Sequence, residues 1–167
     1  MAMSGDAALL ENHTPSRVLT ALDRVAALIP AARCTTVFCA ILDRGTGAVC
    51  YSCAGHLPAI VGRADGGTEL LDDARGLPLA TADLARPEAG TTLAPGDIVL
   101  LYTDGLVERR RCSLDDGIGS AREIVDESRH LAPAAIVERL AEQLLSDGHD
   151  DDVAYLIYQH SDGRGPR

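Results

Sequence analysis

Helical and extended patterns occupy separate parts of this 167-residue chain. Apolar residues follow helical spacing in a run that opens at Thr14-Pro15-Ser16 and stops at Pro30. The same spacing returns over residues 120–128 and 133–145, and only short extended segments lie between the first run and these two. Since a parallel sheet needs alternating strand and helix units, this order predicts an α+β fold built on antiparallel sheets.

The extended segments begin with a predicted β-hairpin. Residues 35–42 are β-branched and apolar, residues 43–47 supply turn chemistry, and residues 48–53 resume the extended pattern. Further strands are expected at residues 59–62, 68–71, 98–103 and 153–158. No repeat or long linker interrupts the chain. We therefore expect one domain over residues 14–160, with flexible ends at 1–13 and 161–167.

The charge balance excludes several classes of function. The chain carries 25 acidic and 15 basic residues, with a net charge of −10. A chain with this charge is not expected to bind nucleic acid. Affinity for nucleic acid depends on clustered cationic side chains that neutralise its phosphates. No apolar stretch approaches the roughly 20 residues that span a bilayer, and the start lacks the pattern of a secretory signal. We expect a cytoplasmic protein that binds neither nucleic acid nor membrane.

The five cysteines give no strong indication of a metal or redox site. Cys50 and Cys53 form a C-x-x-C pattern inside an apolar, strand-like run. A tetrahedral zinc site would need a second pair or a nearby His couple, and the sequence has neither beside this pattern. The cysteines are interpreted as small buried hydrophobes.

Two acidic segments lie where an expected strand meets a loop. Asp104 ends the apolar run at 98–103 and is followed by Gly105, while residues 150–152 are three Asp that lead into the last strand. Mg²⁺ and Mn²⁺ prefer oxygen ligands, so carboxylates at two adjacent strand ends would suit them. The spacing alone leaves an alternative open, because Asp-Gly is a common turn and an acidic run can be a solvated loop.

A lone histidine, His56, follows Gly55 in a turn rich in Gly and Pro. A histidine in such a turn is more often a structural hydrogen-bonding group than a catalytic base. No G-x-S-x-G signature of a serine nucleophile accompanies it. The sequence therefore gives no indication that a protein side chain acts as the nucleophile.

Taken in order, six segments resemble the stage II sporulation protein E (SpoIIE) branch of the metal-dependent protein phosphatases, relatives of protein phosphatase 2C. These segments are Thr36–Asp43, Ala54–Pro58, Gly76–Leu79, Leu93–Asp97, Leu101–Glu108 and Asp151–Ala154. The resemblance covers nearly the whole chain, from about Thr14 to Tyr158. It rests on the order and spacing of all six.

The resemblance implies a protein phosphatase 2C-like α-β-β-α sandwich of antiparallel sheets flanked by helices, with a binuclear Mn²⁺ or Mg²⁺ centre. It also implies hydrolysis of phosphoserine or phosphothreonine, usually on an anti-anti-sigma-like regulatory protein. The family's metal-binding positions fall on Asp104 and Asp151. Supporting positions fall on Thr103, Gly105, Asp152, Gly55 and His56.

Two segments of the family pattern are absent upstream of the helix that starts near Pro15. They are a Gly-Asp segment, which supplies a metal-bridging Asp, and an Asp-x-x-Gly-His-Gly segment. We expect an N-terminally shortened domain whose sheet edge would be open to a homodimer partner. Two functions follow as alternatives: a phosphatase of impaired activity, or a non-catalytic regulatory or phosphoprotein-binding module on the same fold.

Overall fold

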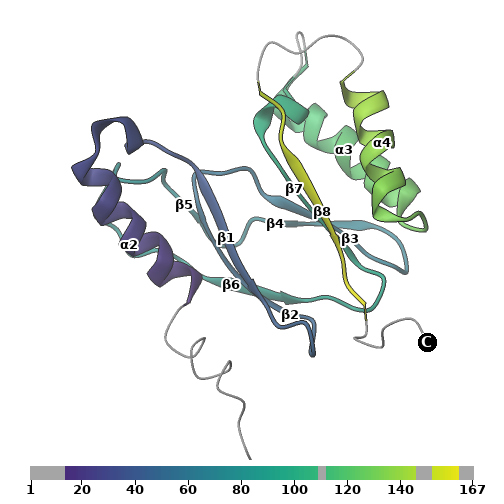
Figure 1. Ribbon diagram of the computed structural model, residues 1–167, viewed down its shortest axis with the longest axis horizontal. Helices are drawn as coiled ribbons and strands as arrows, with labels where there is room; N and C mark the ends of the chain where they lie inside the picture. Colours follow the sequence, from purple (N-terminus) through teal and green to yellow (C-terminus); the bar gives the residue numbers. More distant parts are fainter. Residues whose placement is uncertain (1–13, 109–111, 146–151, 162–167) are drawn as a thin grey trace, which may run out of the picture. The chain divides into compact units, whose positions relative to one another are not determined.

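The computed structural model describes residues 14–108, 112–145 and 152–161. They form two compact units, and the chain passes between them three times. The first unit holds residues up to 56 and residues 72–92, and the second holds residues 57–71 and those from 93 onward. Each unit has one four-stranded sheet and its own helices (Figure 1). The expected flexible end at residues 1–13 lies outside the described residues, and so does the expected tail at 161–167, apart from Ser161.

The sheet of the first unit is built on a β-hairpin. Its strands are β1 (Val37–Leu42), β2 (Ala48–Ala54), β5 (Arg75–Gly76) and β6 (Ala89–Thr92). The turn between β1 and β2 is closed by Asp43, whose Oδ1 accepts a hydrogen bond of 2.8 Å from the Gly45 N–H. β2 pairs antiparallel with β1 and β6, and a two-residue contact with β5 is parallel.

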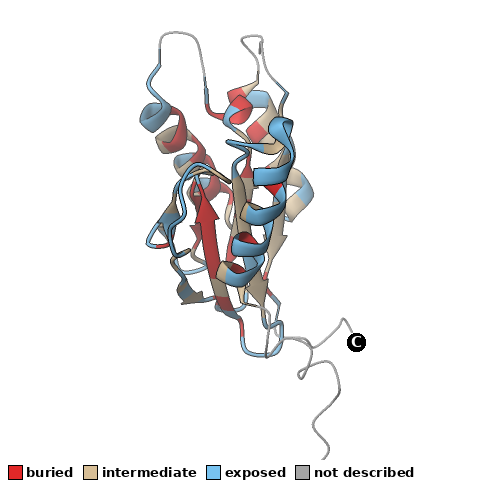
Figure 2. Ribbon diagram, turned by 90° about the vertical axis from the view of Figure 1, so that its left-hand side faces the viewer, coloured by how far each residue is buried: buried red, intermediate tan, exposed pale blue. Residues whose placement is uncertain are grey.

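Helix α2 (Pro15–Leu28) lies along β1 and β2, and a short 3₁₀ turn (Pro30–Ala32) follows it (Figure 1). Proline at the first helical position is pre-organised for a helix start, and Pro30 cannot continue the helix. Leu19 is fully buried, whereas most of the helix surface is exposed (Figure 2). The predicted helix at 14–30 is therefore confirmed.

The sheet of the second unit has the order β4-β3-β7-β8, and every neighbouring pair is antiparallel. Its strands are β3 (Ala59–Gly62), β4 (Thr68–Leu71), β7 (Ile98–Tyr102) and β8 (Tyr155–Gln159). A 3₁₀ turn (Asp104–Leu106) follows β7. Helices α3 (Leu114–Ser128) and α4 (Pro133–Leu144) pack side by side, α3 against β3 and β4, and α4 against β8 (Figure 1).

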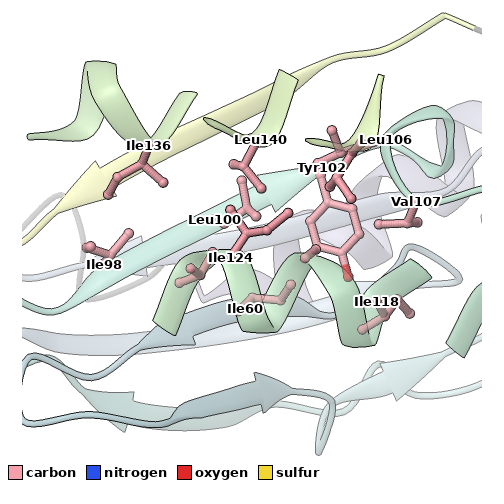
Figure 3. Close-up of a cluster of buried hydrophobic side chains, with 13 residues drawn as sticks. Ile60, Ile98, Leu100, Tyr102, Leu106, Val107, Ile118, Ile124, Ile136 and Leu140 are labelled. Atoms are coloured by element: carbon pink, nitrogen blue, oxygen red, sulfur yellow. The ribbon is translucent and has the colours of Figure 1, made fainter. Parts of the chain in front are cut away.

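The hydrophobic core of the second unit lies between its sheet and its two helices (Figure 3). Alternate residues of β7 are buried, as expected for a strand with one face on a core. They meet apolar side chains of α3 and α4, among them Ile124 and Leu140. The Tyr102 hydroxyl is buried without a hydrogen-bond partner among the described residues, and burial raises its pKa.

The prediction of an α+β fold with antiparallel sheets flanked by helices is confirmed, and two details of the prediction were wrong. Helix α3 starts six residues before the predicted residue 120, because Ser113 and Asp116 form a capping box. The strands β5 and β6 were not predicted, since their short segments contain Gly76 and Gly90 and carry little strand signal. No helix in the described ranges has the length and apolar character to span a bilayer.

Asp97, in the turn before β7, anchors that turn. It is 2% exposed, and its carboxylate accepts hydrogen bonds from the backbone N–H groups of Ala64 (2.8 Å) and Ala94 (3.0 Å) and from Arg63 Nη1 (2.8 Å). Burial by itself raises the pKa of this carboxyl, but the three donors outweigh burial and hold its pKa below the usual value. The buried carboxylate is thus structural.

We expect Asp97→Asn to lower the free energy of unfolding by about 2 kcal/mol at neutral pH, because the amide leaves buried donors unpaired. A lowered native pKa gives stability that is present above the unfolded pKa of about 3.9 and lost as pH falls through the native pKa. The difference in the free energy of unfolding between wild type and Asp97→Asn should therefore become smaller at acid pH. Urea unfolding across pH measures it, with exposed Asp65→Asn as control. An unchanged difference at acid pH would contradict this account.

Candidate metal centre

Asp104 lies just past the end of β7 and begins the 3₁₀ turn that follows. Its side chain is exposed, and its Oδ1 accepts a hydrogen bond of 3.0 Å from the Gly105 N–H. Its backbone oxygen accepts hydrogen bonds from Val107 (2.9 Å) and Glu108 (2.7 Å). The backbone under the carboxylate is therefore fixed, while Oδ2 has no hydrogen-bond partner among the described residues.

Thr103 joins the end of β7 to the segment that leads into β8. Its N–H donates to the Ala154 oxygen at 2.9 Å, and the Ala154 N–H donates to Thr103 Oγ1 at 3.0 Å. The same hydroxyl lies 3.3 Å from the backbone oxygens of Asp152 and Ala154, and can donate to one of them. Two segments about 50 residues apart are thus held side by side.

Gly105 permits a closer approach of these two segments than any other residue would. A Cβ at this position would lie 2.7 Å from the Asp152 backbone oxygen and 3.3 Å from Val153 Cγ2. Real Cβ atoms essentially never come within 3.0 Å of another heavy atom in this way. The backbone of Asp152 therefore lies directly against the turn that carries Asp104. Asp151 itself lies outside the described residues.

Gly55 and His56 belong to the other unit. Gly55 has a positive φ of 68°, donates to the Gly76 oxygen at 2.7 Å, and would clash with Pro78 if it carried a Cβ. His56 is half-buried, and its backbone oxygen accepts a hydrogen bond from Cys53 Sγ at 3.1 Å. The structure thus brings Thr103, Asp104, Gly105 and Asp152 together in one unit and assigns Gly55 and His56 to the other.

The potential ligand atoms beside Asp104 are oxygens. Oxygen ligands suit a hard divalent cation better than a soft metal ion. Within the described ranges, no three His, Cys, Asp or Glu side chains are close enough together to hold a metal ion. Cys50 and Cys53 are three residues apart on β2, so their side chains point to opposite faces of the sheet and do not share a ligand.

The comparison with protein families decides what this chain is related to. The model of the stage II sporulation protein E (SpoIIE) family matches residues 3–161, nearly the whole chain. The chain belongs to the SpoIIE family. This membership confirms the resemblance seen in the six sequence segments, and the class of enzyme predicted from them, a phosphoprotein phosphatase domain, agrees with it.

Solved structures of phosphatase domains share the fold. The structure of the RsbU and RsbW domains of Rv1364c from Mycobacterium tuberculosis is 29% identical, with a TM-score of 0.78, and the match covers 90% of this chain and 43% of that one. The phosphatase domain of SpoIIE from Bacillus subtilis, presoaked with Mn, is 15% identical with a TM-score of 0.64. The match covers 100% of this chain and 78% of that one. RsbX in complex with magnesium is 17% identical with a TM-score of 0.61, and the match covers 86% of this chain and 65% of that one. These matches confirm a protein phosphatase 2C-like fold, and this chain spans less than half of the first structure.

Proposed function

We propose that this chain is a metal-dependent phosphatase domain that removes phosphate from phosphoserine or phosphothreonine of a regulatory protein in the cytoplasm. One observation carries the proposal. Asp104 stands at the end of β7 with a carboxylate oxygen that no described residue contacts by a hydrogen bond, and the chain that follows Asp151 is held directly beside it. Family membership and the Mn²⁺ and Mg²⁺ in the names of two similar structures support a divalent metal at this position.

The residues of the candidate metal centre have separate tasks in this proposal. Asp104 supplies a carboxylate whose orientation is set by the Gly105 N–H, and Asp151 would supply the second. Thr103 holds the backbone from Asp152 to Ala154 and so acts as a positioning residue for Asp151. A bound Mn²⁺ or Mg²⁺ would lower the pKa of a bound water and neutralise charge on the phosphate. This chemistry needs no Ser or Cys nucleophile.

The protein substrate that we propose is a phosphorylated anti-anti-sigma-like protein. The similar M. tuberculosis structure combines RsbU and RsbW domains in one protein, which supports a partner in the same kind of regulatory system. A non-catalytic phosphoprotein-binding module is the second candidate. It is favoured by the lack of a group of three metal-binding side chains within the described residues.

Phosphate release by the purified chain tests the proposal. The chain is incubated with a phosphoserine peptide or a phosphotyrosine peptide, each in Mn²⁺ and in excess chelator. We expect Mn²⁺-dependent release from the phosphoserine peptide, and a melting temperature that Mn²⁺ raises, because a ligand that prefers the native state stabilises it. Background release under every condition would overturn the phosphatase. A melting temperature raised by the phosphoserine peptide, without turnover, would then support the binding module.

Thr103→Val should weaken both metal binding and turnover. Valine has nearly the same shape, but it cannot accept from the Ala154 N–H or donate to the Asp152 oxygen. We expect kcat/KM to fall about tenfold, because small displacements of positioned groups are costly to catalysis. Thr103→Ser keeps the hydroxyl and should stay near wild type. Equal losses in both variants would show that the hydroxyl does not position the site.

A further inference from the structure

The first unit contains a surface pocket that is separate from the candidate metal centre in the sequence. It has a volume of about 480 Å³ and is formed by β5 and the loop of residues 77–88 that joins β5 to β6. Apolar side chains dominate its lining, including Leu77, Leu84 and Pro87. Leu77 is 52% exposed and Leu84 is 67% exposed, so the walls of the pocket face solvent.

The loop around this pocket is held in shape by Arg86, whose side chain is only 5% exposed. Arg86 Nε donates to Asp23 Oδ2 on helix α2 at 2.7 Å, and Nη1 donates to the Leu77 oxygen. Asp23 Oδ1 also accepts from the Ala80 N–H at 2.9 Å. The hydrogen bond from Arg86 is the main reason that the pKa of Asp23 is lowered.

A buried ion pair such as Asp23–Arg86 adds little net stability, because desolvating the two charges offsets their attraction. Its effect here is to fix the conformation of a loop that has no helix or strand between Leu77 and Glu88. Backbone that is fixed at Leu77, Ala80 and Arg86 lowers the conformational entropy that binding would otherwise cost. A low entropy cost of binding is typical of a binding site whose shape is formed before the ligand arrives.

Arg75 gives the pocket its charge. It lies on β5 at the pocket wall, is exposed, and has no hydrogen bond or ion pair with any residue that the structure describes. The other arginine of the pocket, Arg86, is neutralised by Asp23. In a chain of net charge −10, the pocket therefore combines apolar walls with one positive charge that has no partner within the described ranges.

We propose that this pocket docks a segment of a partner protein in which an apolar side chain stands next to a carboxylate. The apolar side chain covers Leu77 and Leu84, and the carboxylate pairs with Arg75. Covering apolar surface favours binding, and the charge pair selects the segment. Because Leu77 and Leu84 face solvent, the pocket is open to a segment of a protein chain. The inference goes beyond the proposed function and does not depend on metal binding.

A peptide titration followed by NMR tests the docking site. The probes are three capped pentapeptides: Ala-Asp-Leu-Asp-Ala, its charge-reversed form with Lys for Asp, and a form with Ala for Leu. We expect the acidic leucine peptide to shift the amide signals of residues 77 and 84–86, with a dissociation constant of about 1 mM. The other two peptides should bind at least about fivefold more weakly.

Arg75→Gln should raise that dissociation constant about tenfold, because it removes a charge-assisted hydrogen bond. Arg44→Gln is the matched control, since Arg44 is an exposed arginine in the turn between β1 and β2 of the same unit, away from the pocket lining. The proposal is overturned if the acidic peptide causes no shifts at residues 77 and 84–86. It is also overturned if all three peptides bind equally, or if the two variants bind alike.

Discussion

Asp104→Asn is expected to lower Mn²⁺-dependent phosphate release by at least about 100-fold, because loss of a ligand should cost at least as much as loss of a group that orients one. Asparagine keeps the size of the side chain and can still accept from the Gly105 N–H, but it has no charge to offer a cation. Asp151→Asn should have an effect of similar size. Initial rates over a range of Mn²⁺ concentrations measure both.

The Asp104 variant should fold normally, since the carboxylate is exposed and makes one described hydrogen bond, to its neighbour Gly105. Its melting temperature without metal should match wild type, while the increase caused by Mn²⁺ should disappear. Asp65→Asn is the control, because Asp65 is exposed in the turn between β3 and β4. Wild-type Mn²⁺ dependence in Asp104→Asn would exclude this carboxylate as a ligand.

Local patterns were enough to predict the helices that begin with proline. Pro15 and Pro133 each stand at the first position of a helix, and the apolar spacing behind them marks the buried face. The start of α3 was missed because Gly117 and Gly119 are poor helix formers, although Ser113 with Asp116 was a readable capping signal. In the prediction, the poor helix propensity of the two glycines was given more weight than the capping signal.

The candidate site shows a different limit of sequence reasoning. The strand-end position of Asp104 could be predicted, because an apolar run ends at an Asp-Gly pair. The hydrogen bonds between Thr103 and Ala154 could not, since they depend on the register in which β7 pairs with β8. The same holds for Asp23 and Arg86, which are 63 residues apart and meet only when the loop packs on α2.

Gly117→Ala is expected to destabilise the chain by about 4 kcal/mol, near the upper end for a single substitution. A Cβ at Gly117 would lie 1.9 Å from the Val107 backbone oxygen and 2.8 Å from its carbonyl carbon. Val107 is fully buried and directly follows the 3₁₀ turn that begins at Asp104. Relief of the clash must therefore shift helix α3 or the segment that carries the candidate metal ligand.

Gly119→Ala is the matched control, because it makes the same change two residues later in the same helix. A Cβ at Gly119 meets no atom of the described residues within 4 Å, so alanine there should add about 1 kcal/mol through its better helix propensity. The difference between the two variants isolates the contact with Val107, since the gain in propensity is common to both. Urea unfolding at neutral pH measures it. If both variants were equally stable, close packing of α3 on residue 107 would not be a requirement of this fold.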